Sequence, residues 1–326
     1  MGNLPKPLSV AVALSALAAA LCASASISVH AADKKYKIAF VVANVNDGFY
    51  QKAHQGAAAE AEKLGVELIY QGPTQFSAQA EIPVVDTLLA QHPDAIAIAP
   101  ADPTALIAPL KKWADAKIPI VTYDGYLTNP PFPLVSEIMS ANYDGGKLAG
   151  EAMGKLIGGK GKVAVIDLAA GLKVLNDRKD GFIAALKEKY PDVEVVDTQL
   201  TALDFPRAQT IVQTYVNKYP DLAGIFCTYS FATEYGGAGL LSVHAQDRIK
   251  LVGFEAGPKE IQLIKQGVLK ATVAQKPADE AKLAVDYAYY QASGQTDKIE
   301  KKPVLGDVVI DAGNVDAMTE YYYAVK

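Results

Sequence analysis

Short apolar runs alternate with longer helix-like stretches along most of the chain. The first run, residues 38–42, is an unbroken row of apolar side chains, and a helical pattern at 49–64 follows it. An unbroken apolar row is typical of a strand that is buried on both faces of a parallel sheet. Further runs at 66–70, 94–98 and 118–123 alternate with helical patterns in the same way. Strands that alternate with helices indicate βαβ units joined by right-handed crossovers.

The same order of elements begins again in the second half of the chain. Residues 162–166 match the first run, 192–196 echo the second, 219–226 echo the third and 249–255 echo the fourth. Because the repeat is so long, it indicates a duplicated domain rather than a solenoid. The pattern predicts an α/β protein with two similar Rossmann-like lobes, each built on a parallel sheet, which face each other across a cleft.

The tail from Leu269 onward is too short for a third lobe. We expect it to contain two strands and two helices, and to complete first one lobe and then the other. This gives three crossings between the lobes, near Ser140, Gln275 and Gly306, which act as a three-strand hinge. The predicted N-terminal lobe comprises residues 32–139 plus 276–305, and the predicted C-terminal lobe comprises residues 140–275 plus 306–326.

The first 31 residues have a different character. A positive Lys6 precedes an apolar stretch at 8–22, and small residues follow up to Ala31, which is the layout of a secretory signal peptide cleaved after Ala31. A membrane anchor is an alternative, but the stretch is short for a span of about 20 residues. A lipoprotein with Cys22 as the lipidated residue is another, although the preceding Leu21 is larger than such signals prefer. The signal places the mature protein in the periplasm.

Composition narrows the class of protein. The chain has 326 residues, of which 50% are hydrophobic and 21% charged, as in ordinary globular proteins. The net charge is −5, or −6 once Lys6 is lost with the signal, and this argues against a nucleic-acid partner because phosphate binding needs a basic surface. Cys227 would be the one cysteine of the mature chain, and its apolar surroundings indicate a buried hydrophobe without a disulfide.

Candidate binding residues follow from the repeat, because ligands of open parallel sheets bind beyond the carboxyl ends of the strands. Asp124 and Glu255 occupy equivalent strand ends, one in each lobe. Ionised carboxylates accept strong hydrogen bonds from hydroxyl groups, so the pair suits a polyhydroxylated ligand. The alternative is that each is a solvated strand-end acid or a helix N-cap.

Aromatic and basic side chains lie at the same strand ends. Phe49, Tyr50 and Tyr229 follow predicted strands, and Phe205 precedes a helix. Flat apolar rings can sandwich a sugar, although each ring could equally be core packing. The forked guanidinium of Arg178 could clamp ligand oxygens, or it could belong to an ordinary solvated helix arginine.

Other chemistry has no sequence support. No G-x-G-x-x-G follows the first strand, no phosphate loop is present, and no G-x-S-x-G motif occurs. The histidines lack metal-ligand spacing, and nothing marks a raised-pKa acid beside a nucleophile. We therefore expect no catalytic residue, no metal and no cofactor.

These residues together resemble the ribose-binding-protein branch of periplasmic solute-binding proteins, which have the type I fold and serve ABC sugar importers. The resemblance covers essentially the whole chain after the signal. It rests on the segments 38–42, 46–50, 118–124, 140–146, 178–182, 251–255 and 271–275.

The resemblance implies roles for particular residues. The ring-stacking aromatics would be Phe49, Tyr50 and Phe205, and the hydroxyl-binding polar groups would be Asp47, Asp124, Arg178, Glu255 and Gln275. Ribose binders differ at five positions. They have asparagine where Asp47 and Ala99 stand, arginine where Gly125 stands, asparagine near Tyr229, and aspartate where Glu255 stands.

Compared with the pocket of ribose binders, the pocket of this chain would lack one cation and two amides and would have more bulk and more negative charge. A different pentose or hexose, a polyol, a furanose-like signal molecule or a partly cationic ligand fits as well as ribose.

The resemblance implies a monomeric, non-catalytic receptor that closes on its ligand and delivers it to the permease subunits of an ABC transporter. A secreted glycosidase-like enzyme on a two-lobed scaffold is one alternative. A sensory co-receptor for a furanose-type signal molecule is another, and the sequence does not separate it from transport. A sugar-sensing transcription regulator would need a DNA-binding motif where the signal peptide stands.

Overall fold

The computed structural model describes residues 1–2 and 35–323. The cleavage site after Ala31, the apolar stretch at 8–22 and Cys22 lie outside the described residues. Residues Tyr36–Lys326 form one compact unit, distinct from Met1–Lys35. Among the helices of the described ranges, none combines the length and the apolar character that crossing a membrane requires.

Two six-stranded sheets form the framework, and their strand orders are equivalent. The first sheet has the order β11-β5-β4-β3-β1-β2, and all of its strands are parallel. The second has the order β12-β10-β9-β8-β6-β7, in which β12 alone is antiparallel, to β10. The strands of the first sheet are β1 (Lys37–Val41), β2 (Glu67–Gln71), β3 (Ala95–Ile98), β4 (Ile120–Tyr123), β5 (Ser136–Ser140) and β11 (Val304–Leu305). Those of the second are β6 (Lys160–Asp167), β7 (Asp192–Leu200), β8 (Leu222–Cys227), β9 (Lys250–Phe254), β10 (Leu269–Ala274) and β12 (Val308–Asp311).

The matching orders confirm the predicted fold class. Strands β1 to β5 occupy the same relative places in the first sheet as β6 to β10 do in the second. We call the first sheet with its helices lobe 1, and the second sheet with its helices lobe 2.

Helices cover the sheets and explain the unbroken apolar strands. In β1, Ile38 and Phe40 belong to one buried cluster, whereas Ala39 and Val41 belong to another, which contains Trp113. Successive side chains of a strand point to opposite faces, so a strand covered on both sides must be apolar throughout. The lobe 1 helices are α2 (Gly48–Leu64), α3 (Ala78–Leu89), α4 (Ile107–Asp115) and α10 (Pro277–Ser293). The lobe 2 helices are α5 (Asn142–Leu156), α6 (Lys173–Lys189), α7 (Arg207–Lys218), α8 (Ser230–Ser242) and α9 (Pro258–Lys265).

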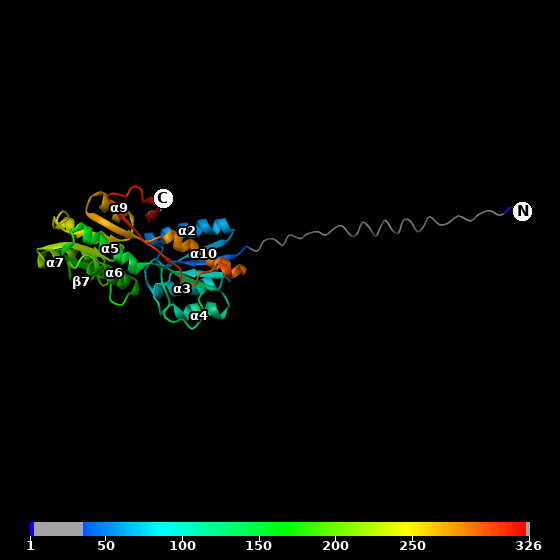
Figure 1. The fold of residues 1–326 in the computed structure, drawn as a ribbon. Coiled ribbons are helices and arrows are strands. Elements are labelled where there is room, and N and C mark those ends of the chain that lie inside the picture. The colour runs from blue at the N-terminus through cyan, green and yellow to red at the C-terminus, as the bar shows by residue number, and fades with distance from the viewer. Residues whose placement is uncertain (3–34, 324–326) are drawn as a thin grey trace. The chain divides into compact units, whose positions relative to one another are not determined.

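Two helix pairs matter for the site (Figure 1). Helix α10 packs against α2, although more than 200 residues separate them in the sequence, and α5 packs against α6. In the second pair, a Cβ added to Gly146 would lie 2.0 Å from the carbonyl oxygen of Arg178, and one added to Gly181 would lie 1.9 Å from that of Tyr143. The two glycines therefore let the backbones of α5 and α6 touch. This contact fixes the position of the Arg178 backbone, from which its side chain extends into the site.

The chain passes between the sheets three times. It leaves lobe 1 after β5, returns after β10, and crosses again between β11 and β12. These passages contain or adjoin Ser140, Gln275 and Gly306. The exact lobe boundaries given above stay a prediction.

The prediction that the tail contains two strands and two helices was wrong. Residues 269–323 hold three strands, the one α-helix α10, and two short 3₁₀ turns at Thr296–Lys298 and Thr319–Tyr321. Strand β11 has only two residues, too few for a readable pattern, and Gly306 separates it from β12 in the other sheet. Residues 304–311 thus contribute one strand to each lobe.

Candidate functional site

Asp124 and Glu255 lie on matching turns. Each directly follows a central strand, β4 or β9, and each has a left-handed backbone, with φ of 57° and 77°. The N–H of Asp124 donates to the carbonyl of Ile138 at 3.0 Å, and that of Glu255 donates to Val273 at 2.6 Å. Non-glycine residues adopt this conformation infrequently and at a cost, so the surrounding fold must impose it. The duplication therefore reaches down to the backbone geometry of these two residues.

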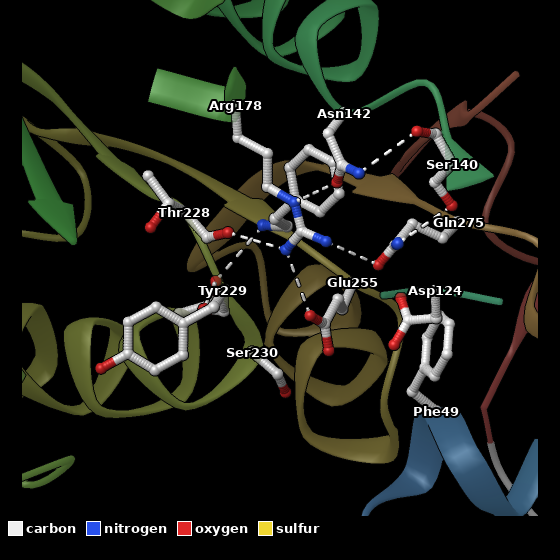
Figure 2. A network of polar contacts seen from close by, with 12 residues as sticks. Phe49, Asp124, Ser140, Asn142, Arg178, Thr228, Tyr229, Ser230, Glu255 and Gln275 are labelled. Carbon is white, nitrogen blue, oxygen red and sulfur yellow. Dashed lines mark hydrogen bonds and ion pairs between the residues drawn. The ribbon is translucent and has the colours of Figure 1, made fainter. Parts of the chain in front are cut away.

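Arg178 is the centre of a buried hydrogen-bond network (Figure 2). Its side chain comes from α6 and is 3% exposed. Nε donates to Asn142 Oδ1 at 2.8 Å, and Nη2 donates to Gln275 Oε1 at 2.9 Å. Nη1 donates to the Thr228 carbonyl at 3.0 Å and to Glu255 Oε1 at 3.3 Å. Four of the five N–H donors of a guanidinium thus have partners within the described part of the chain.

The guanidinium is also held from one side by an aromatic ring. The Arg178 Cζ atom lies 3.9 Å from the centroid of the Phe254 ring. A cation over a ring face gains electrostatic attraction, more so when both are desolvated. Arg178 is therefore a fixed part of the site, unlike the solvated helix arginine considered as an alternative.

Lobe 1 contributes two carboxylates in different roles. The Tyr50 hydroxyl donates to Asp124 Oδ2 at 2.7 Å. Asp47 is the N-cap of α2, and its Oδ1 accepts from the N–H of Phe49 at 2.8 Å. The helix N-cap role, which the sequence raised as an alternative for Asp124 and Glu255, is held in lobe 1 by Asp47 instead.

The three carboxyls are electrostatically coupled. Burial raises the pKa of Glu255 to about 8, against the attraction of Arg178 and with added repulsion from Asp47 and Asp124. Burial also raises the pKa of Asp47 to about 6, opposed by the Phe49 backbone bond and reinforced by Asp124. The pKa of Asp124 is raised by burial too, opposed by Tyr50 and Arg178. Three mutually repelling carboxyls beside one guanidinium favour a bound proton or hydrogen-bond donors from a ligand.

The predicted aromatic residues form two groups, with Phe49 and Tyr50 in lobe 1 and Phe205 and Tyr229 in lobe 2. Phe49 is 4% exposed and packs edge-on against Tyr50 at 5.1 Å and Tyr323 at 5.7 Å between ring centroids. Phe205 stacks on Phe231 at 4.4 Å.

Tyr229 lies near the network only through its backbone. Its hydroxyl is hydrogen-bonded to the Thr201 hydroxyl, and Figure 2 shows its phenol ring directed away from Arg178. The carbonyl that Arg178 contacts belongs to the preceding residue, Thr228. The side chain of Tyr229 thus supports lobe 2, beside Phe205.

A cavity of about 160 Å³ lies between the two lobes. Asp47 and Phe49 of lobe 1 line it together with Glu255 of lobe 2. Arg178 and Gln275 belong to the buried network that Glu255 joins to this cavity, whereas Tyr50 and Asp124 form a separate hydrogen-bonded pair in lobe 1. These four residues are not among those that line the cavity. The remaining lining residues are Asn46, Gly48, Ser230, Phe231, Glu234, Gly257, Pro258, Lys259, Glu260 and Tyr323.

Sequence reasoning missed several residues that build the site. Asn142 orients Arg178, Ser140 accepts from the Gln275 amide at 3.0 Å, and Tyr323 packs on Phe49. Asn142 and Ser140 lie in the segment 140–146, which carried the resemblance without a role for either side chain. No pattern pointed to Tyr323, at the end of the tail.

A duplicated α/β fold with three passages between the lobes, and with matched polar turns of which one lines an interlobe cavity, defines a two-lobed solute-binding protein. Residues 38–296 match the family model described as a periplasmic binding protein domain, and the chain belongs to that family. This confirms the resemblance drawn from the sequence.

Relatives agree in length as well as in sequence. The ribose import binding protein RbsB of Salmonella typhimurium is 30% identical over 264 residues, covering 81% of this chain and 87% of its own. The D-apiose import binding protein of Paraburkholderia graminis is 28% identical over 287 residues, covering 86% and 89%. A crystal structure of an ABC transporter solute-binding protein from Agrobacterium vitis, bound with alpha-D-tagatopyranose, has a TM-score of 0.83 and 34% identity, covering 89% and 100%.

Proposed function

We propose that this protein is the sugar-binding receptor of an ABC importer, which takes a monosaccharide or a polyol of similar size into the interlobe cavity and delivers it to a permease. The observation that carries the proposal is the matched pair Asp124 and Glu255, on equivalent turns of the two lobes, with Arg178 in contact with one of them. Glu255 lines the cavity from lobe 2, and we propose that Asp124 offers the matching acceptor from lobe 1 when a ligand binds. The relatives named above, which are import binding proteins, support the same role.

Closure follows from the geometry of the cavity. A ligand that contacts Asp47 and Phe49 on one wall and Glu255 on the other interacts with both only when the lobes are together. Such a ligand shifts the population toward the closed form by its differential affinity. Three passages between the lobes allow bending while they keep the axis of motion. The permease would then recognise the closed form.

The search for the ligand should include D-ribose but extend to other sugars and polyols. A thermal-shift screen of D-tagatose, D-ribose, D-allose, D-arabinose and the matching polyols, followed by calorimetry, should give at least one saturable ligand. Asp124→Asn, which tolerates the left-handed backbone, should weaken its binding by about 1–3 kcal/mol. Asp180→Asn, at an exposed position on the same helix as Arg178, is the control. A folded protein that binds none of these compounds would contradict the proposal.

We propose binding without turnover. Raised-pKa acids near other carboxyls also occur in glycosidases. Here Arg178 contacts Glu255 and the Tyr50 hydroxyl donates to Asp124, so both carboxyls are held as hydrogen-bond acceptors, which supports binding. Incubation with nitrophenyl glycosides should release no nitrophenol. Release that scales with protein concentration and is lost in Glu255→Gln would favour the enzyme alternative.

We also propose a periplasmic location and a monomeric state, which the signal-like first 31 residues and the family support. The protein recovered by osmotic shock should begin at Ala32. Light scattering should give the mass of one chain. A protein that stays with the membrane fraction would favour the anchor or lipoprotein alternative.

A further inference from the structure

Tyr323 joins the two walls of the cavity and the hinge. It is 2% exposed and is the last described residue, after β12 of lobe 2. Its backbone N–H donates to the carbonyl of Ala256 at 3.0 Å, directly after Glu255. This bond ties the residue to the lobe 2 wall of the site.

The hydroxyl of Tyr323 is bound to the second passage between the lobes. It accepts from the backbone N–H of Gln275 at 3.0 Å. The side chain of Gln275 in turn accepts from Arg178 at 2.9 Å and donates to Ser140 at 3.0 Å. The phenol oxygen binds the backbone of Gln275, and the side-chain amide of the same residue binds the guanidinium of Arg178. Tyr323 thus helps to set the position of the residue that orients Arg178.

The ring of Tyr323 lies against the lobe 1 wall. It packs edge-on to Phe49, with an angle of 87° between the rings. A Cβ placed on Gly48 would lie 3.5 Å from the Tyr323 Cβ and 3.7 Å from its carbonyl oxygen, which is ordinary contact. The first turn of α2 therefore rests directly on this residue, beside the cavity that Tyr323 also lines.

On the basis of the proposed function, we propose that Tyr323 is a positioning residue of the ligand site, which sets the placement of Phe49 relative to Gln275 and closes that end of the cleft. Its hydroxyl and its ring act on different partners. The hydroxyl orients Gln275, and through it Arg178. The ring supports Phe49 and limits the opening of the cavity beside α2.

Two variants separate these contributions. Tyr323→Phe keeps the ring but leaves the Gln275 amide without its acceptor, so the exchange of that amide with solvent deuterium should be about tenfold faster or more. Tyr323→Ala also removes the ring, so the first turn of α2 should exchange faster as well. With D-tagatose as the probe, Tyr323→Ala should bind about tenfold or more weakly, mostly through faster dissociation. Tyr323→Phe should restore part of that dissociation rate. Tyr321→Ala, on the same tail, should leave both readouts unchanged.

Each outcome decides the proposal. A general loss of stability would accelerate exchange throughout both lobes, whereas positioning changes only the Gln275 amide and the start of α2. Unchanged exchange in Tyr323→Phe overturns the proposal whether or not any sugar binds. Faster exchange with unaltered D-tagatose binding rates also overturns it. If D-tagatose and every other sugar fail to bind the wild-type protein, the proposed function fails, while the exchange measurements still decide whether Tyr323 holds Gln275 and α2.

Discussion

The hydroxyl of Tyr50 donates a 2.7 Å hydrogen bond to the Asp124 carboxylate, and so links the first helix of lobe 1 to the end of its fourth strand. The bond uses one acceptor lone pair of a buried acid and helps to stabilise its charged form. The bond therefore holds the Asp124 carboxylate in a fixed orientation.

Tyr50→Phe should weaken sugar binding by about 1 kcal/mol, or roughly fivefold, while leaving the fold intact. The removed hydroxyl leaves the Asp124 carboxylate without its donor, which favours the protonated acid. Calorimetry and a thermal melt would measure the two effects. Tyr70→Phe, in the same lobe, is the control, and an unchanged affinity in Tyr50→Phe would show that the bond does not prepare the site.

Arg178→Lys should lower the free energy of unfolding by about 2 kcal/mol and abolish detectable sugar binding at micromolar concentrations. A lysine keeps the charge but cannot reach Asn142, Thr228 and Gln275 together, so buried acceptors lose their donors. Urea denaturation gives the stability change. Arg207→Lys, at an exposed position on α7, should be neutral. Wild-type stability in Arg178→Lys would mean that the network contributes little.

Glu81 should make the stability of lobe 1 depend on pH. This residue is 0% exposed, and Oε2 accepts from the Ala101 N–H at 2.8 Å, while Oε1 has no hydrogen-bond partner among residues 35–323. Burial raises its pKa from 4.5 to about 8, opposed by the Ala101 bond. A carboxyl with a raised folded pKa contributes stability that is complete below its unfolded value and is lost as the pH rises through about 8.

Glu81→Gln mimics the protonated acid, so it should melt close to the wild-type at pH 5 and higher than the wild-type at pH 9, by about 3 °C or more. Melting curves between these values test the sign of the effect. The exposed Glu62→Gln on α2 serves for comparison. Parallel wild-type and Glu81→Gln curves across the range would contradict a buried, protonated Glu81.

Gly146→Ala should destabilise the protein by about 1–3 kcal/mol and weaken ligand binding as well, because the added methyl would displace the Arg178 backbone. Gly48→Ala introduces only ordinary contacts and should have a much smaller effect on stability. Chemical denaturation of both variants gives the comparison. A tolerated alanine at 146 would show that α5 and α6 can separate without cost.

The duplicated α/β pattern and the equivalent acids could be predicted because both follow from local order along the chain. Strand 38–42 is apolar throughout since both of its faces are covered, and Asp124 and Glu255 each follow such a strand. Contacts between distant segments left no comparable signal. Asn142 meets Arg178 only because Gly146 brings α5 onto α6, and Tyr323 reaches Phe49 only when the tail has packed.

The tail shows the same limit on a larger scale. Two residues of β11 pair with β5, yet a two-residue strand has no periodicity to recognise. The direction of the Tyr229 phenol depends on a partner, Thr201, that follows a different strand. Residue type and spacing thus indicate which strand ends gather at a site, while tertiary packing decides which side chains enter the site.

The late return of α10 and β11 to the first sheet has a consequence for how the protein is made. A nascent chain that emerges from the ribosome or from a secretion channel in N-to-C order presents β1 to β5 long before residues 277–305 can cover them. The second sheet has all but β12 available by residue 274. The second sheet can therefore be nearly complete before the first, which still lacks β11 and its covering helix α10 until residues 277–305 have been made.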